Sequence, residues 1–185
     1  ELPNITNYYR DGFLRALDRD IIAKTKPRVV IDLNHSPAAE LLPALLNEIG
    51  CEVIELNSHI DETYMPSALE DQSDPFEPMG QINNALKATA GFWLGPSGER
   101  AVYIDGAGRI ITQTEILTLL SALTAKVRQE GAIVLPIAAP HTIDEIAREH
   151  RIQVIRTKGD GRSLGVAATD SNVYLAGDLE GRVAF

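Results

Sequence analysis

The sequence predicts an α/β protein made of two units. Short apolar runs alternate with amphipathic segments of helix length along the whole chain of 185 residues. Several of those segments begin with residues that cap helices. Residues 28–57 also show a strand–helix–strand pattern, which is typical of a parallel pair of strands. An apolar content of 44% is typical of a globular protein.

The first predicted element is a single amphipathic helix over residues 8–24, because apolar side chains recur there at helical spacing. Its apolar positions are Phe13, Leu14, Leu17, Ile21 and Ile22. Pro27 ends the helix, since a proline disfavours the helical conformation of the residue before it. Residues 28–34, RVVIDLN, are then predicted to form a short buried strand.

A second helix is predicted to begin with Ser36 as N-cap and Pro37 as its first helical residue. Gly50 follows its last apolar residue and suits a left-handed cap. Pro43 lies inside this segment and predicts a kink or a break in the hydrogen bonding. Residues 51–57, CEVIELN, are the next predicted strand, parallel to the first.

The middle of the chain contains a polar loop, a helix and a hairpin. Residues 58–78 are too irregular to predict any element, and residues 81–90 are expected to be helical. In residues 91–105, GFWLGPSGERAVYID, two apolar runs flank a polar turn, which predicts a hairpin. We expect the boundary near this hairpin, with units at residues 1–107 and 108–185.

The second unit is predicted to begin with a long helix that has a capping box at Thr112 and Glu115 and ends at Gly131. A second capping box is predicted at Thr142 and Glu145. The other expected elements are a strand at 132–137, a helix at 146–150, a strand at 152–156, a Gly-rich turn at 159–165 followed by a short helix, and a strand at 173–177.

Charge and composition exclude several classes of function. A net charge of −9 without a basic run argues against nucleic acid or an anionic membrane surface as a partner. No apolar stretch approaches the ~20 residues that span a bilayer, and the start does not resemble a secretory signal. Cys51 is the one cysteine, so we expect a buried thiol and a cytoplasmic protein. We also expect a fragment of a longer protein, since no initiator Met is present.

Residue patterns alone point to few sites. The Gly-rich turn at 159–165 has the spacing G-x-G-x-x-x-G, so it is either an anion-binding turn or a simple turn. The acidic loop after residue 58 is either a cation site or a solvated face. Ser58 and His59 lack the context of a hydrolase triad. No metal-ligand spacing relates the histidines His35, His59, His141 and His150.

Two long stretches resemble one family. Residues 28–57 resemble the second domain of the α-D-phosphohexomutases, the phosphoglucomutase and phosphomannomutase family, and residues 116–158 resemble its third domain. The resemblance implies two consecutive α/β/α mutase-type domains with mixed, partly parallel sheets. It also implies a role in carbohydrate metabolism. The family's phosphoserine motif and its fourth domain have no match here, so the resemblance assigns no catalytic residue to this chain.

The turn of the predicted hairpin aligns with the family motif D-G-D-x-D-R, whose aspartates hold Mg²⁺. Gly95 and Ser97 stand at two lost ligand positions, Glu99 replaces the third aspartate, and Arg100 retains the arginine. Magnesium prefers a compact octahedron of oxygen ligands, most of them anionic or water. The resemblance therefore implies that Glu99 is at most a weak ligand, and we expect this chain to bind no magnesium.

A second family motif, G-E-x-S-G-H, contacts the sugar. Here Asp178 stands at the glutamate, Glu180 at the serine and Arg182 at the histidine, while Lys158 begins a turn similar to a third family loop. The resemblance makes Arg100, Lys158, Asp178, Glu180 and Arg182 the candidate sugar- or phosphate-binding residues. The added negative charge of Glu180 is expected to repel a phosphorylated sugar.

Two motifs altered in parallel favour a scaffold that has lost phosphotransfer. The leading hypothesis is a non-catalytic sugar-phosphate-binding or assembly region of a larger sugar-nucleotide-synthesising protein. A similar region occurs in bacterial pyrophosphorylases of the mannose-1-phosphate guanylyltransferase type. The expected partners are a sugar phosphate and the remaining domains of the parent chain. The alternatives are a fragment of an active phosphohexomutase, in which Glu99 still recruits magnesium, and a purely structural interaction module.

Overall fold

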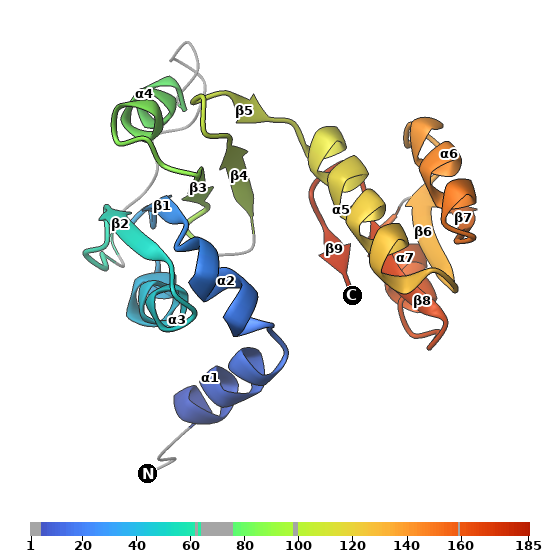
Figure 1. Ribbon diagram of the computed structural model, residues 1–185, viewed down its shortest axis with the longest axis horizontal. Coiled ribbons are helices and arrows are strands. Elements are labelled where there is room, and N and C mark those ends of the chain that lie inside the picture. The colour runs from blue at the N-terminus through green and yellow to red at the C-terminus, as the bar shows by residue number, and fades with distance from the viewer. Residues whose placement is uncertain (1–4, 62, 64–75, 98–99, 159) are drawn as a thin grey trace. The chain divides into compact units, whose positions relative to one another are not determined.

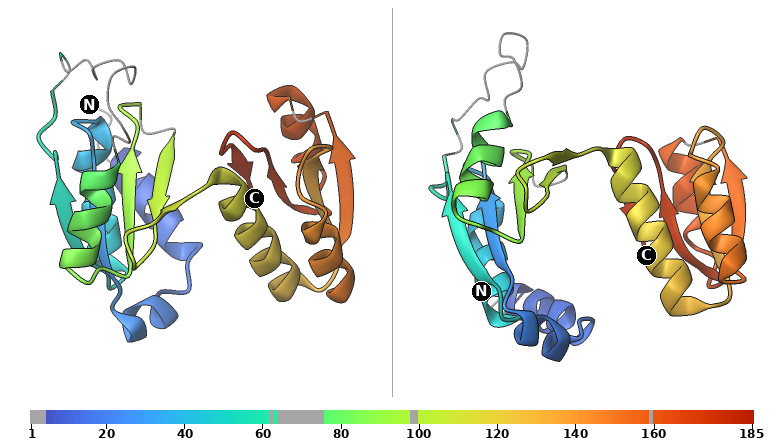
Figure 2. Two further views of the ribbon diagram at one scale, coloured as in Figure 1. Left: turned by 90° about the horizontal axis from the view of Figure 1, so that it is seen from above. Right: turned by 45° about the horizontal axis from the view of Figure 1, so that its top comes forward.

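The computed structural model describes residues 5–61, 63, 76–97, 100–158 and 160–185 (Figure 1). The chain divides into two compact units, Glu1–Ile110 and Ile111–Phe185, and each is described by itself. Each unit has helices on both faces of a mixed sheet (Figure 2), so the predicted α/β class with partly parallel sheets is confirmed. None of the helices described here has the length and hydrophobicity that a bilayer crossing requires.

The first unit is built on a sheet with the order β2-β1-β3-β4-β5. Its strands are β1 (Arg28–Asp32), β2 (Glu52–Leu56), β3 (Ala90–Leu94), β4 (Ala101–Ile104) and β5 (Ile110–Ile111). Strand β1 pairs in parallel with both β2 and β3, and β3 pairs antiparallel with β4. The predicted parallel pair and the predicted hairpin are therefore both confirmed.

Helices cover both faces of this sheet, and the inner strand β1 is apolar on both sides. The helical elements are α1 (Ile5–Arg15), α2 (Arg19–Thr25), the 3₁₀ helix η1 (Pro37–Glu40), α3 (Leu42–Glu48) and α4 (Glu77–Ala85). Val30 and Ile31 are consecutive in β1, so they project to opposite faces. Val30 packs in one cluster with Met79 of α4, whereas Ile31 packs in another with Leu42 of α3.

The single helix predicted for residues 8–24 is wrong, because the chain forms α1 and α2 instead. The side chain of Asp18 accepts a hydrogen bond from the backbone N–H of Ile21 and so caps a new helix. A carboxylate that bonds locally to the backbone competes with a continuous helix. As a result Ile21 is 61% exposed, while Leu14 is buried against α3.

The segment after Ser36 shows the break that Pro43 predicts. It forms η1 and then α3, with Pro43 in the first turn of α3. Ser36 occupies the N-cap position of η1 but makes no capping hydrogen bond with its side chain. Gly50 has a φ of +100°, as predicted, and a Cβ there would lie 2.7 Å from the Cα of Ala23. The helix predicted for residues 81–90 occurs earlier, as α4.

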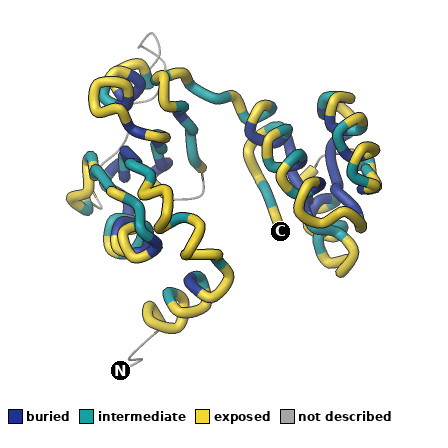
Figure 3. The backbone as a smooth tube through the Cα atoms, in the orientation of Figure 1, coloured by how far each residue is buried: buried dark blue, intermediate teal, exposed yellow. Residues whose placement is uncertain are grey.

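The second unit has a sheet of order β7-β6-β8-β9. Its elements are α5 (Gln113–Arg128), β6 (Ala132–Pro136), α6 (Thr142–Glu149), β7 (Gln153–Thr157), α7 (Gly161–Ala167), β8 (Val173–Gly177) and β9 (Val183–Ala184). Strand β6 is buried throughout (Figure 3) and pairs in parallel with β7 and β8. Ile133 and Leu135 pack in the cluster that includes α5 and α6, and Val134 packs against Leu164 of α7.

The two capping boxes predicted here have different outcomes. Thr112 and Glu115 form both reciprocal hydrogen bonds, at 3.2 and 2.8 Å, so that prediction is confirmed. The box at Thr142 is wrong, because His141 is the N-cap of α6 and makes no capping bond with its side chain. Helix α5 ends on a left-handed Gln129 rather than at Gly131.

Candidate functional site

Both units bring their candidate loops to the carboxyl ends of parallel strands. The turn Gly95–Arg100 follows β3, Lys158 follows β7, and the turn Asp178–Arg182 follows β8. In open α/β sheets, ligands bind at this edge of the sheet. Strand order therefore places the candidates where α/β proteins hold small ligands.

The turn after β3 is closed by the backbone N–H of Gly95, which donates to the carbonyl of Arg100 at 2.8 Å. Gly95 is buried, whereas Ser97 and Arg100 are exposed. A Cβ on Gly95 would meet no atom closer than 3.6 Å, so the backbone does not demand glycine there. Glu99 lies outside the described residues, and its role as a weak ligand stays a prediction.

The described residues of this turn do not fit a magnesium ion. Gly95, Pro96, Ser97 and Arg100 provide one hydroxyl, one cation and no carboxylate. In the part of the chain that the structure describes, no three histidine, cysteine or acidic side chains gather into a possible metal site. Magnesium is usually held through one or two carboxylates, so these residues supply no magnesium chemistry of their own.

The turn after β8 is organised around the carboxylate of Asp178, which is 2% exposed. One oxygen of Asp178 accepts the backbone N–H groups of Glu180 and Arg182, each at 2.9 Å. The other oxygen accepts Nε of Arg182, and Nη2 of the same arginine donates to Glu180. The backbone N–H of Asp178 closes the turn by donating to the Arg182 carbonyl at 3.0 Å.

This network determines the charge of its members. Burial acts to raise the pKa of Asp178, but the hydrogen bonds and the charge of Arg182 outweigh it, so the pKa lies below its ordinary value. The hydrogen bond and charge of Asp178 raise the pKa of Arg182 in turn. Asp178 is therefore ionised and already holds three donors. A sugar hydroxyl would have to compete with them.

The structure brings three of the five predicted binding residues together. Asp178, Glu180 and Arg182 form the network of the β8–β9 turn, in which the single guanidinium of Arg182 pairs with both carboxylates and leaves one net negative charge. Lys158 is exposed at the end of β7, and β6 separates β7 from β8. Arg100 belongs to the first unit.

The start of α7 lies beside this network, since a Cβ on Gly161 would lie 3.3 Å from Nη1 of Arg182. Asp160 caps the helix by accepting the backbone N–H of Ser163 at 2.8 Å and its hydroxyl at 2.7 Å. The carboxylate of Asp160 thus accepts hydrogen bonds that a bound anion would otherwise accept. This geometry favours the simple turn over the anion-binding turn, and Gly159 lies outside the described residues.

Sequence reasoning missed a second copy of the same turn in the first unit. Asp105 accepts the backbone N–H groups of Ala107 and Arg109 at 3.0 and 2.9 Å and Nε of Arg109 at 3.2 Å. Gly108 and Gly181 occupy equivalent places with φ values of +84° and +93°. The pattern Asp-x-x-Gly-Arg at 105–109 and 178–182 was visible in the sequence and indicates an internal lock of the turn.

Sequence reasoning also missed Arg156, which holds the loop after β6. Its guanidinium donates to the carbonyls of Pro136 and Ala139 at 2.9 and 2.7 Å and pairs with Asp144 of α6. Burial acts to raise the pKa of Asp144, but the bonds and charge of Arg156 lower it below its usual value. No local spacing relates these residues, so only the fold identifies the contact.

The strand order of both sheets and the loops at their carboxyl edges define an α/β protein with two mixed sheets. Residues 7–108 match the family model described as phosphoglucomutase/phosphomannomutase, alpha/beta/alpha domain II. The match covers more than half of the chain. The chain therefore belongs to the phosphoglucomutase/phosphomannomutase family, as a domain of carbohydrate metabolism.

Relatives agree with this assignment, and solved structures share the fold. A phosphoglucomutase/phosphomannomutase of Thermococcus kodakarensis is 29% identical over 98% of this chain and 40% of its own length. A putative phosphomannomutase structure from Thermus thermophilus has a TM-score of 0.84 at 13% identity, covering 98% of this chain and 42% of that one. A family structure from Burkholderia thailandensis has a TM-score of 0.76 at 19% identity, over 98% of this chain and 39% of that chain. The chain thus spans about 40% of the length of the relatives it matches.

Proposed function

We propose that this chain is a mutase-fold module without phosphotransfer activity, which binds a sugar phosphate or serves in assembly within a larger protein. We further propose that this larger protein synthesises sugar nucleotides, as pyrophosphorylases of the mannose-1-phosphate guanylyltransferase type do. The observation that carries the proposal is the internal lock of Asp178 and Arg182, which occupies groups that the family resemblance assigns to the sugar.

The turn after β3 supports the same proposal. Gly95 is neither at positive φ nor crowded around its Cβ position, so an aspartate at this position is sterically acceptable. The missing carboxylate is therefore a change of chemistry and not a demand of the fold. The second candidate is an active phosphohexomutase, which is favoured by relatives named as mutases, such as the Thermococcus kodakarensis protein.

A mutase assay on the complete parent protein separates the two candidates. The reaction contains mannose 1-phosphate or glucose 1-phosphate, magnesium and a bisphosphate activator, and we expect no turnover. Turnover that disappears in Glu99→Ala but persists in the matched control Glu130→Ala would overturn the proposal. Calorimetric titration of the same sugar phosphates into the 185-residue chain measures whether binding remains.

A restored magnesium turn provides a positive control. The variant carries Gly95→Asp, Ser97→Asp and Glu99→Asp, which rebuild the three family carboxylates. We expect magnesium to raise the melting temperature of this variant and to leave that of the parent chain unchanged, because carboxylates are its preferred protein ligands. An equal magnesium-dependent rise in the parent chain would contradict the proposed loss of the metal site.

A further inference from the structure

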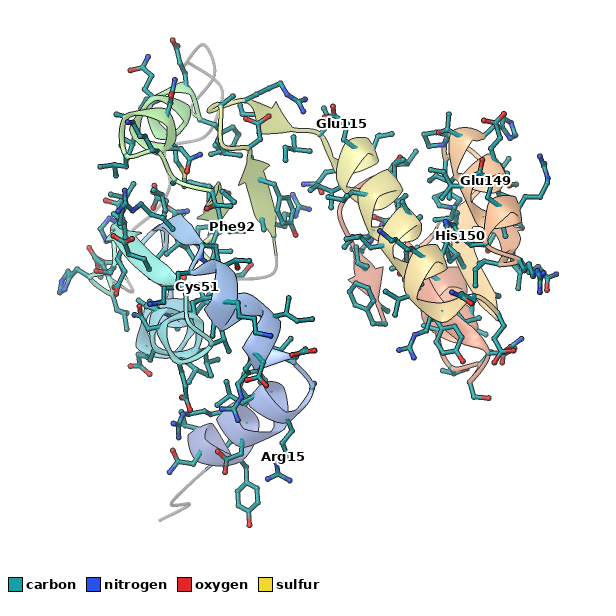
Figure 4. The ribbon with its side chains drawn as sticks, viewed as in Figure 1. Arg15, Cys51, Phe92, Glu115, Glu149 and His150 are labelled. Carbon is teal, nitrogen blue, oxygen red and sulfur yellow. The ribbon has the colours of Figure 1, made fainter. Side chains whose placement is uncertain are left out.

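The outer edge of β7 is a feature of the second unit that the family assignment does not use. Among the described strands, β7 is the outer strand of its sheet and pairs only with β6. A shallow groove of about 420 Å³ lies between this strand and α6. Its lining residues are Asp144, Arg148, Arg151, Ile152, Gln153 and Val154. Figure 4 marks the end of α6 with Glu149 and His150.

The backbone of β7 presents peptide groups along this edge. The backbone N–H of Gln153 donates to the carbonyl of Gly131 at 2.9 Å, and the carbonyl of Thr157 accepts the N–H of Ile137 at 2.9 Å. The peptide groups of these alternate residues therefore face β6. In a parallel ladder the intervening residues face the other way, which turns the peptide groups of Val154 and Arg156 outward. Outward N–H and C=O groups on an outer strand are a template for one more strand.

The groove carries positive charge that the protein itself does not neutralise. Arg148 and Arg151 are exposed, and neither guanidinium has an ion-pair partner among the residues that the structure describes. Asp144 also lines the groove, but its carboxylate pairs with Arg156. Glu145 and Glu149 are exposed on the same helix and do not line the groove.

The other sheet edges in the described part of the chain differ from β7. Strand β2 is equally long but carries Glu52 and Glu55, and Glu52 pairs with Arg28 at 3.0 Å. Strands β5 and β9 each have two residues. A strand of two residues offers little backbone for pairing, and the glutamates of β2 would repel an acidic segment. Strand β7 therefore combines full length with basic flanking residues.

We propose that the β7 edge is a docking site for an extended acidic segment of a partner protein, which adds to the sheet as a further strand. Main-chain hydrogen bonds to Val154 and Arg156 would supply affinity, and acidic side chains paired with Arg148 and Arg151 would supply specificity. A second copy of the same edge is a poor occupant, because β7 itself contains no acidic side chain that could pair with Arg148 and Arg151. The proposal goes beyond the proposed sugar-phosphate role and does not depend on it.

The charge in the proposal is tested by fluorescence anisotropy with the whole 185-residue chain. The probe is a short labelled peptide of alternating glutamate and valine. We expect Arg148→Glu combined with Arg151→Glu to weaken its binding at least about tenfold, since like charges across an interface are strongly unfavourable. The matched control Arg19→Glu, on α2, leaves the affinity unchanged, and a lysine–valine peptide does not bind. Equal affinity in the parent and charge-reversed chains would overturn the proposal.

The strand addition is tested separately with a probe peptide whose amides are all N-methylated. This peptide keeps its charge but loses its main-chain donors on both edges, so we expect it not to bind. Val154→Pro removes an outward donor of β7 and keeps the ladder to β6, and it should also abolish binding. If that variant unfolds, amide NMR shifts of Val154 and Arg156 in the parent chain replace it. Equal binding of the methylated peptide, or displacement of the probe by inorganic phosphate without those shifts, would show an anion site only and refute strand addition.

Discussion

Replacement of Asp178 by alanine tests whether this residue locks a turn or binds a sugar. The carboxylate is 2% exposed and accepts two backbone N–H groups and one guanidinium N–H within the β8–β9 turn. If it is a lock, its removal must cost stability in the absence of any ligand. If it is a sugar ligand, its removal must cost binding first.

The magnitude follows from the partners that Asp178→Ala leaves behind. The backbone N–H groups of Glu180 and Arg182 lose their acceptor, at about 1 kcal/mol each or somewhat more where water cannot reach them. The Arg182 side chain is 56% exposed and is rehydrated, so it adds little. We therefore expect a loss of about 2 to 3 kcal/mol in the free energy of unfolding of the second unit.

Urea unfolding followed by circular dichroism, with hydrogen exchange at the amides of β8 and β9, measures this loss. The fluorescence of Trp93, the only tryptophan, reports on the first unit and serves as an internal control. Asp178→Asn keeps an acceptor for the backbone N–H groups, so its free energy of unfolding should fall by less than that of Asp178→Ala. Asp105→Ala in the equivalent turn should also lose less, because that side chain is 30% exposed.

The refuting result is specific. An Asp178→Ala chain with unchanged unfolding and unchanged exchange, but with weaker binding of a sugar phosphate, would show that Asp178 is a ligand residue. The internal lock would then not be the reason that its carboxylate is buried. The proposal of a module without phosphotransfer activity would then lose the observation that carries it.

Acid unfolding, two glycine substitutions and alkylation of the thiol test three further consequences of this structure. The pKa of Asp178 is lowered in the folded chain, so ionised Asp178 stabilises the folded state above pH about 3.9, and this stabilisation is lost as the pH falls through the lower folded pKa. Asp178→Asn should flatten this pH dependence in acid unfolding curves. Gly181→Ala should destabilise the chain, because φ is +93° and a Cβ would lie 2.8 Å from Oε1 of Gln113. Gly165→Ala, in an open part of α7, should stabilise it by up to about 1 kcal/mol, so the melting temperature of the parent chain should lie between those of the two variants. Burial raises the pKa of the Cys51 thiol, so iodoacetamide at neutral pH should react more slowly with it than with free cysteine, and an equal rate would contradict this.

Much of the fold could be predicted because its determinants are local. The buried strands at 28–32 and 132–136 are apolar runs between helix-length segments, and both were expected. The capping box at Thr112 and the break at Pro43 depend only on neighbours in the chain. The predictions failed at residues 16–18, where Asp18 caps a new helix, and at Thr142, where His141 is the N-cap of α6.

The candidate site shows the same division. The family resemblance pointed to the loops that follow β3, β7 and β8, and the structure places these loops at the carboxyl ends of strands with parallel neighbours. It could not predict which partners the side chains choose there. Asp178 fits the sugar-binding position by alignment, yet the fold directs its oxygens to Arg182 and to the backbone of its own turn.

Arg156 illustrates the limit most clearly. Its partners lie 12 to 20 residues away in the chain, on a loop and on a helix, and no periodicity relates them. Sequence alone determined the elements and their alternation, because backbone conformation and apolar periodicity are properties of neighbouring residues. The tertiary structure decided which charges are neutralised, which donors are occupied and which strand edge stays open, because those depend on groups that meet only after the chain has folded.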